Sequence, residues 1–408
     1  MGAIRSSPAL FGAPIEFYLF GLMLIGVALF HKRALAISVT GLLAILAYET
    51  LVTRFPTGSG AAALLLHGQH EWVMVANLFL LLVGFELLSN HFERSNLPDH
   101  LPSHLPGGWA GGVALLGAIF VLAAFLDNIA AAVLGGVMAR HVYKGRVAIG
   151  FLAAIVAASN AGGSGSVIGD TTTTLMWLHG VSPTLVLPAY IAALPAFAIV
   201  AMFGARAQHR HQPLLPAGES GEPLHWRRIW IVAFILVAAV TANVLANLLG
   251  NGKETAPWLG LALWAAILLT SAIARPDWKV AGPAAKGAVF LCALVAAASL
   301  MPLKSLPEPS WQSSFGLGML SSVFDNIPLT ALALRQGGYD WALLSFAVGF
   351  GGSMTWFGSS AGVAITNEFP EARSLRRWLV EGWFVPVGYA VGFFVMLAIW
   401  GWDTRIAT

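Results

Sequence analysis

The sequence is poor in charge and has almost no cysteine. Lys, Arg, Asp and Glu make up 10% of the 408 residues, whereas a soluble globular domain has about a quarter. The single cysteine, Cys292, cannot form an internal disulfide, and its apolar neighbours suggest a small buried hydrophobe. The net charge of +3 comes mostly from short segments beside apolar runs. This pattern indicates membrane topology and argues against nucleic-acid binding.

The signatures of several enzyme classes are also missing. The chain has no phosphate-binding loop of the GxxxxGK[ST] type, which excludes ATP hydrolysis by the chain itself. It has no HExxH zinc motif. We therefore expect no enzyme activity and no cofactor.

Long apolar segments dominate what is present. The chain is 57% hydrophobic, with a mean hydropathy of +0.76. Apolar runs of about 18 residues predict membrane-spanning helices. We expect an all-α polytopic membrane protein with ten crossings. The predicted crossings are residues 17–30, 34–52, 72–89, 147–178, 184–205, 228–249, 257–274, 286–300, 341–369 and 380–400.

Two further apolar stretches, 108–139 and 312–334, carry an Asp-Asn pair in the middle. Each is predicted to be a re-entrant hairpin with the pair near its tip. The alternative is two ordinary spans in each stretch. The second arms, 129–139 and 327–334, are too short to cross a hydrocarbon core of roughly 30 Å, which favours hairpins.

The distribution of basic residues predicts the topology. Sixteen Lys and Arg fall on one side of the predicted spans and six on the other. The richer side should be cytoplasmic, which places both termini outside a cell inner (plasma) membrane. Five predicted crossings separate the two hairpins, and an odd number reverses the orientation of the second half. The sequence therefore predicts inverted repeats, a plan typical of alternating-access transporters.

This topology divides the chain into four predicted parts. Residues 1–66 form N-terminal helices, and 67–205 form a first inverted repeat with hairpin 108–139 and broken helix 147–178. Residues 206–227 form a polar cytoplasmic linker. Residues 228–402 form the second repeat, with hairpin 312–334 and broken helix 341–369.

Glycine-rich breaks interrupt two of the predicted crossings. Gly162-Gly163-Ser164 is followed by Gly169-Asp170-Thr171-Thr172, and Gly351-Gly352-Ser353 by Gly358-Ser359-Ser360. Unpaired backbone groups are tolerated at membrane depth only where they line a cavity or an ion site. Close helix packing would explain the glycines but not an aspartate kept in the break. Because serine replaces aspartate in the second break, we expect the first half to hold the more strongly charged site.

Asp127 and Asp325 stand at the predicted hairpin tips. A charge near the bilayer centre costs about 2.5–3.5 kcal/mol, so an aspartate without a role is not expected there. Each could bind an ion, cap the helix that follows, or do both. Asn128 and Asn326 can ligate through their side-chain carbonyls and also fix the tips.

The candidate ion- or substrate-binding residues are the polar groups and glycines of these tips and breaks. They are Asp127, Asn128, Asn160, Gly162, Gly163, Ser164, Asp170, Thr171, Thr172, Asp325, Asn326, Gly351, Gly352, Ser353, Ser359 and Ser360. Asp170, Asp127 and Asp325 are the candidate ligands for Na⁺. Glu86 and Glu381 lie near span ends, where they could relay protons or sit at the membrane interface.

With these motifs the chain resembles the ion transporter superfamily, and within it the NhaD-type sodium/proton antiporters and the citrate-transporter-like proteins. The resemblance rests on Phe125-Leu126-Asp127-Asn128, on the stretch from Asn160 to Thr172, and on Asp325-Asn326-Ile327-Pro328 with Gly358-Ser359-Ser360. It implies a hairpin and a broken helix in each half, a moving transport domain on a static scaffold, and a homodimer. It also implies that Asp127, Asn128, Asn160, Asp170, Asp325 and Asn326 are site residues. Antiporter-like sequences tend to have alanine and proline where Ser164 and Val167 stand here.

Two functions remain open from the sequence. In sodium/proton antiport, one carboxylate would bind either Na⁺ or H⁺, and this competition would couple the two fluxes. In the alternative, H⁺ or Na⁺ would drive uptake of citrate or another anion, although buried acids without a buried base make a poor anion pocket. A channel or a membrane scaffold suits the paired breaks less well. We expect a small ion or molecule as substrate, membrane lipid and a second copy of the chain as partners, and no nucleic acid.

Overall fold

The computed structural model describes most of the chain, and the described residues are almost entirely helical. The described residues are 9–10, 13–30, 33–52, 60–100, 105–126, 128–167, 169–214, 223–249, 256–302 and 307–404. The strands β1 (Ala9–Leu10) and β2 (Ala13–Pro14) form a short antiparallel pair before the first helix.

The chain divides into two compact units. Unit 1 comprises Met1–Leu88, Ala233–Pro307 and Ala331–Gln336, and unit 2 comprises Ser89–Val232, Glu308–Thr330 and Gly337–Thr408. The boundary runs through three helices, α3, α11 and α15.

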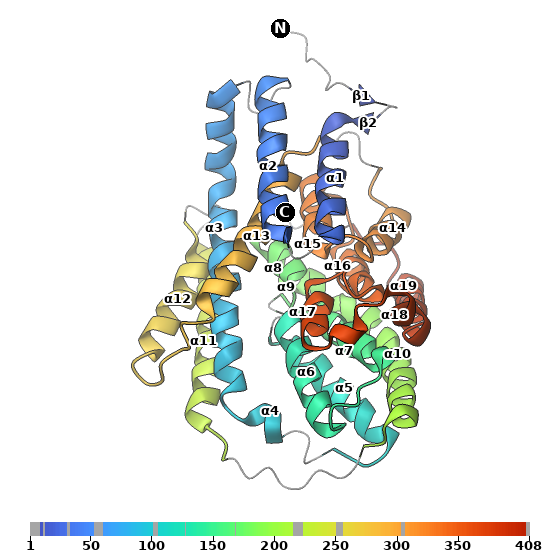
Figure 1. Cartoon of the computed structure of the whole chain (residues 1–408). Helices are drawn as coiled ribbons and strands as arrows, with labels where there is room; N and C mark the ends of the chain where they lie inside the picture. The colour runs from blue at the N-terminus through green and yellow to red at the C-terminus, as the bar shows by residue number, and fades with distance from the viewer. Residues whose placement is uncertain are drawn as a thin grey trace. The chain divides into compact units, whose positions relative to one another are not determined.

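Among the described residues, six helices lie in unit 1 wholly or for most of their length, and α15 is divided about equally between the two units. Figure 1 labels these six helices, which are α1 (Ile15–Leu29), α2 (Ala34–Leu51), α3 (Gly60–Glu93), α11 (Trp226–Leu249), α12 (Trp258–Thr270) and α13 (Ala281–Ser299). The remaining elements belong to unit 2, apart from the second half of α15. They are α4 (Leu97–His100), α5 (Trp109–Ala123), α6 (Asn128–Val142), α7 (Ile149–Gly163), α8 (Thr171–Leu178), α9 (Pro183–Val186), η3 (Leu187–Ala189), α10 (Tyr190–His211), α14 (Trp311–Ser321), α15 (Asn326–Gln336), α16 (Trp341–Gly351), η5 (Gly352–Met354), α17 (Ser360–Glu368), η6 (Pro370–Ala372), α18 (Leu375–Glu381) and α19 (Phe384–Trp400).

The predicted all-α class is confirmed, and every predicted crossing coincides with a helix or a broken pair of helices. Several helices extend beyond the predicted crossings. Helix α3 begins at Gly60, before the predicted start at residue 72. Helix α10 continues to His211, so the first residues of the predicted linker 206–227 are helical. The physical reason at α10 is that alanine, arginine and glutamine are good helix formers, and the first proline of the predicted linker, Pro213, comes only after the helix end.

Four helices of the described chain are long and apolar enough to cross a membrane. These segments are Ala34–Leu51, Val75–Phe92, Pro183–His211 and Ala281–Ser299, and α18 with α19 makes a fifth candidate that is bent by 60°. The helices of the predicted hairpins are shorter: α6 has 15 residues, which is about 22 Å of helix. This length fits a hairpin arm better than a full span of roughly 30 Å. The total of ten crossings and the re-entrant path stay predictions.

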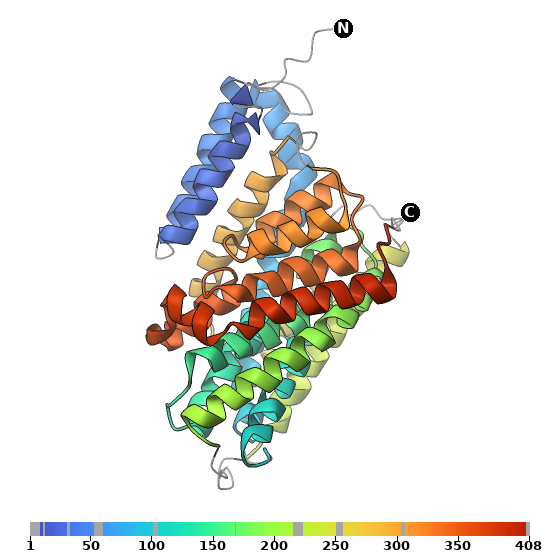
Figure 2. The ribbon, with the colours of Figure 1, turned by 90° about the vertical axis from the view of Figure 1, so that its right-hand side faces the viewer.

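Unit 1 is held together by helix contacts and a few buried polar groups. Helices α1 and α2 lie side by side in Figures 1 and 2. Asn77 on α3 accepts from the Gly260 amide at 3.0 Å, and the Trp264 indole donates to the Leu80 carbonyl at 2.9 Å. The predicted buried thiol is confirmed, because Cys292 is 8% exposed on α13.

Unit 2 contains both segments predicted to be hairpins, apart from the end of α15, and both broken helices. Helices α10 and α19 run alongside each other (Figure 2). In the first half, hairpin arm α5 packs against α7, and in the second half, α14 packs against α16. Helix α7 is buried along its whole length, so the first break lies in the interior of the unit.

Candidate functional site

Both predicted breaks are present. Helix α7 ends at Gly163 and α8 begins at Thr171, while α16 ends at Gly351 and α17 begins at Ser360. The residues before α8 and α17 are Asp170 and Ser359, and both have extended backbone. Each side chain accepts a hydrogen bond from an amide of the helix that follows. The two breaks therefore end in the same N-cap geometry, once with a charge and once without.

Close backbone contact explains one glycine of each break. A Cβ at Gly162 would lie 2.0 Å from the Phe120 carbonyl oxygen on α5, and a Cβ at Gly351 would lie 2.1 Å from the Gly318 carbonyl oxygen on α14. Only glycine fits such an approach. In each half the break is thus seated against the first arm of its hairpin.

Asp170 is the most exceptional group of the site. Its side chain is 1% exposed. Its Oδ1 accepts from the Thr172 amide at 3.0 Å and from the Asn326 Nδ2 at 3.4 Å. Its Oδ2 makes no hydrogen bond of normal geometry with any described residue, and the buried Thr172 side chain lies close to the carboxylate. A buried carboxylate oxygen without a partner is costly, so its presence points to a ligand.

Asp325 has a different environment. Its Oδ1 accepts from the Ile327 amide at 3.1 Å, and its Oδ2 accepts from the Ser360 hydroxyl at 2.9 Å. The capping alternative is therefore confirmed for this residue, and both of its oxygens have partners. Ion binding by Asp325 stays a prediction. Asp127 lies outside the described residues.

Asn160 connects three parts of the site. It is fully buried, and its Oδ1 accepts from the Asn128 Nδ2 at 2.9 Å. Its own Nδ2 donates to Ser353 at 2.9 Å and to Ser359 at 3.3 Å. The first hairpin, the first break and the second break thus meet at one amide. Two predicted residues far apart in sequence, Asn160 and Ser359, are brought into contact only by the fold.

The backbone carbonyls of the breaks are less available than the sequence suggested. The Gly162 carbonyl accepts from the Tyr190 hydroxyl at 2.9 Å, and the Ser353 carbonyl accepts from the Trp378 indole at 3.2 Å. The Ser345 hydroxyl donates to the Ser164 carbonyl. Side-chain donors therefore already occupy three of the break carbonyls, whereas Asp170 Oδ2 has no such partner among the described residues.

The remaining predicted residues line the same region. Gly163 packs against the Gly169 carbonyl, and Gly352 packs against the Gly358 carbonyl. In each half, these contacts bring the two ends of the break together. Thr171 is the first residue of α8 and is 5% exposed. No group of three or more His, Cys, Asp or Glu side chains is placed to hold a metal ion in the described part of the chain. A site for Na⁺ would thus depend on carboxylate, hydroxyl and amide oxygens together.

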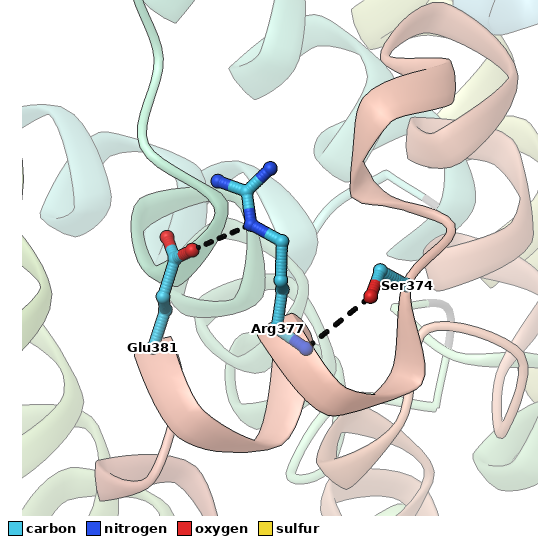
Figure 3. Close-up of polar contacts among 3 residues, drawn as sticks. All are labelled: Ser374, Arg377 and Glu381. Atoms are coloured by element: carbon cyan, nitrogen blue, oxygen red, sulfur yellow. Dashed lines mark hydrogen bonds and ion pairs between the residues drawn. The ribbon is translucent and has the colours of Figure 1, made fainter.

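Glu381 forms an ion pair near the start of the last predicted span. It pairs with Arg377 one turn earlier on α18, with 2.9 Å between Arg377 Nε and Glu381 Oε1, and the Arg377 amide donates to Ser374 (Figure 3). This exposed pair favours the interfacial interpretation of Glu381 over proton relay. Glu86 is exposed on α3.

Sequence reasoning missed three residues at the site. Gly349 lies on α16, and a Cβ there would be 3.0 Å from Asp170 Oδ2. Its signal was available, because Gly349 stands before the second glycine pair as Asn160 stands before the first. Tyr190 and Trp378 bind break carbonyls from α10 and α18, and no local pattern marks them.

Comparison with known proteins gives two similar antiporters. No family model matches the chain. Sodium/proton antiporter 1 of Arabidopsis thaliana is 26% identical over 439 aligned residues, which cover 96% of this chain and 73% of that protein. Sodium/proton antiporter 2 of the same plant is 26% identical over 327 residues, which cover 69% of this chain and 75% of that protein. This similarity supports the resemblance to antiporter-type transporters drawn from the motifs, while the NhaD or citrate-transporter-like subtype stays a prediction.

Proposed function

We propose that this chain is a multi-pass membrane transporter that exchanges Na⁺ for H⁺. The observation that carries the proposal is the fully buried Asp170 carboxylate, whose Oδ2 has no hydrogen-bond partner among the described residues. Either a proton or a small hard cation would satisfy this oxygen, and the two cannot occupy it together. The name of both similar proteins supports the same exchange.

In this mechanism Asp170 carries the exchanged ion and its neighbours orient it. The Thr172 amide and Asn326 Nδ2 hold Oδ1, so Oδ2 is the atom that takes Na⁺ or H⁺. The buried Thr172 hydroxyl, beside the carboxylate, supplies a second oxygen for Na⁺. Because protons compete for the carboxylate, Na⁺ affinity rises with pH until the group is fully deprotonated.

The anion alternative fits the site less well. Four helices, α6, α8, α15 and α17, begin at the site, and helix starts attract anions. However, Asp170 and Asp325 already cap α8 and α15, and Ser359 caps α17. The capping carboxylates offset the positive helix ends, so little positive potential remains for citrate.

Alternating access of the elevator type is the motion that we propose. The hairpins and broken helices of both halves gather in unit 2, and α1, α2, α12 and α13 belong to unit 1. This division supports a transport domain that moves on a scaffold, and a homodimer through the scaffold would fix it in the membrane. Glycine-rich breaks that join helices in each half suit such a motion.

The test uses purified protein in liposomes that contain a pH-sensitive dye. Adding Na⁺ or Li⁺ outside acidic liposomes should raise the internal pH within the time of the measurement, and K⁺ should have a smaller effect. Protein-free liposomes give the background. A pH response to citrate and none to Na⁺ or Li⁺ would overturn the proposal in favour of anion uptake.

A further inference from the structure

Two positions in unit 2 correspond to each other in the two halves. Asn160 stands two residues before Gly162, and Gly349 stands two residues before Gly351. Their surroundings correspond as well, because Gly162 and Gly351 make the same close contact with a hairpin carbonyl, at 2.0 and 2.1 Å from an added Cβ. Asn160 and Gly349 therefore occupy matching places on α7 and α16.

Each of these positions faces the N-cap residue of the opposite break. Asn160 Nδ2 donates to the Ser359 hydroxyl at 3.3 Å. On the other side, Asp170 Oδ2 lies 3.0 Å from where a Cβ on Gly349 would be. In the contact between Asn160 and Ser359 the larger side chain is Asn160, on the helix before the break. In the contact between Gly349 and Asp170 it is the N-cap residue, Asp170. The missing side chain of Gly349 leaves room beside the carboxylate.

The Asn160 amide and the Asp170 carboxylate are held in similar ways. A hairpin asparagine donates to the first oxygen of each: Asn128 to Asn160 Oδ1 at 2.9 Å, and Asn326 to Asp170 Oδ1 at 3.4 Å. The two planar groups differ in their second atom. In Asn160 it is an NH₂ with two donors, and in Asp170 it is an oxygen that only accepts when ionised.

The partners of that second atom decide what each side can bind. Both donors of the Asn160 NH₂ are used, on the hydroxyl oxygens of Ser353 and Ser359. These are the oxygens that a cation in this half would coordinate. Asp170 Oδ2 has no partner in the described chain. The hydrogen bonds of the Asn160 side chain are therefore complete without an ion, whereas those of the Asp170 carboxylate are not.

We infer that the amide of Asn160 takes the place of a second cation, so that each protomer binds a single Na⁺, at Asp170. This inference rests on the proposed antiport but adds its stoichiometry. It also assigns different roles to two residues. Asn160 is a positioning residue that joins the two halves, and Gly349 provides the space that the ion at Asp170 needs.

Binding of radioactive Na⁺ to the purified full-length protein at alkaline pH tests the count. We expect one Na⁺ per protomer in the wild type and none in Asp170→Asn. Two Na⁺ per protomer in the wild type, or one in a folded Asp170→Asn variant, would overturn the inference. Antiport activity with two bound ions would leave the proposed function intact, whereas absence of cation-driven proton flux in the wild type would overturn that function itself.

Asn160→Asp tests the assignment of the amide. The substitution keeps the shape of the side chain and the acceptor for Asn128, but replaces the NH₂ by a charged oxygen facing Ser353 and Ser359. We expect the folded variant to bind two Na⁺. A monodisperse Asn160→Asp protein that still binds one would contradict the assignment.

Gly349→Ala tests the space beside Asp170, and it does so even if Asn160→Asp does not fold. The added Cβ would meet no heavy atom within 4 Å except Asp170 Oδ2 at 3.0 Å, outside its own helix backbone and chain neighbours. We expect Na⁺ affinity to fall about tenfold or more, with an unchanged melting temperature or a higher one. Gly117→Ala is the matched control, because an added Cβ on that α5 glycine meets nothing within 4 Å. Unchanged Na⁺ affinity in Gly349→Ala would contradict the role given to Gly349.

Discussion

At the scale of single residues, the two described acids of the site differ in how many of their oxygens are satisfied. Asp325 uses both oxygens within the protein, on the Ile327 amide and the Ser360 hydroxyl. Asp170 uses one and leaves the other buried without a partner in the described chain. Since an unsatisfied buried carboxylate oxygen costs free energy, this difference is why we propose Asp170, rather than Asp325, as the residue that holds the exchanged ion.

Asp170→Asn should abolish exchange and leave the fold intact. Asparagine is as good an N-cap as aspartate, so α8 keeps its start, but the side chain can no longer hold Na⁺ or release a proton. In the liposome assay we expect the Na⁺-driven pH change to fall about 100-fold or more, which corresponds to about 2.8 kcal/mol. Size-exclusion chromatography should show a monodisperse protein. Wild-type exchange in this variant would remove Asp170 from the mechanism.

Asp325→Asn should have a smaller effect. The asparagine Oδ1 still accepts from the Ile327 amide, so α15 remains capped. The Nδ2 that replaces Oδ2 cannot accept from Ser360 and donates to its hydroxyl oxygen instead, so only one charge-assisted bond is lost. We expect the exchange rate to stay within about tenfold of the wild type, which is less than about 1.4 kcal/mol. The same liposome assay measures it beside Asp170→Asn. A complete loss equal to that of Asp170→Asn would show that Asp325 also binds the exchanged ion.

At the scale of elements, backbone contacts position the breaks. Each break packs closely against the backbone of the first arm of its hairpin through two glycines, Gly162 and Gly169 in the first half and Gly351 and Gly358 in the second. Hydroxyl and indole groups from α10, α16 and α18 hold the open carbonyls. The described residues of the breaks are therefore packed against the first hairpin arms and held by side chains of neighbouring helices.

Gly351→Ala should destabilise this packing. The new Cβ would lie 2.1 Å from the Gly318 carbonyl oxygen, and because that atom belongs to the backbone, α14 or α16 must shift. Overpacking of this kind costs about 1–3 kcal/mol. Thermal unfolding of the detergent-solubilised protein should show a lower melting temperature and a loss of exchange. The control is Gly316→Ala on α14, the helix that carries Gly318, since a Cβ added at Gly316 would meet nothing within 4 Å. Equal melting temperatures for the two variants would contradict the role given to this packing.

At the scale of the whole molecule, the basic residues predict an orientation that can be tested with the single cysteine removed. In a Cys292→Ser background, Glu308→Cys and Arg210→Cys each introduce one thiol at an exposed position. Three predicted crossings separate these positions, so they should lie on opposite sides of the membrane. A membrane-impermeant maleimide should label Glu308→Cys in intact cells, and Arg210→Cys only after permeabilisation. Labelling of both from the same side would contradict the predicted inverted repeats.

The sequence by itself determined the elements and the chemical types of the site. Apolar length and the breaks at Gly162-Gly163 and Gly351-Gly352 predicted the helices, because a hydrocarbon core demands internal hydrogen bonding and makes every interruption conspicuous. Asp170 was predicted as a site residue because close helix packing does not explain a carboxylate in such a break. Only the tertiary structure decided which of these groups meet and which remain unsatisfied. Asn160 and Ser359, or Asp170 and Gly349, are separated by more than 150 residues, and no local pattern reports whether a carboxylate oxygen has a partner. That depends on how two breaks from distant parts of the chain pack together, which is a property of the folded unit.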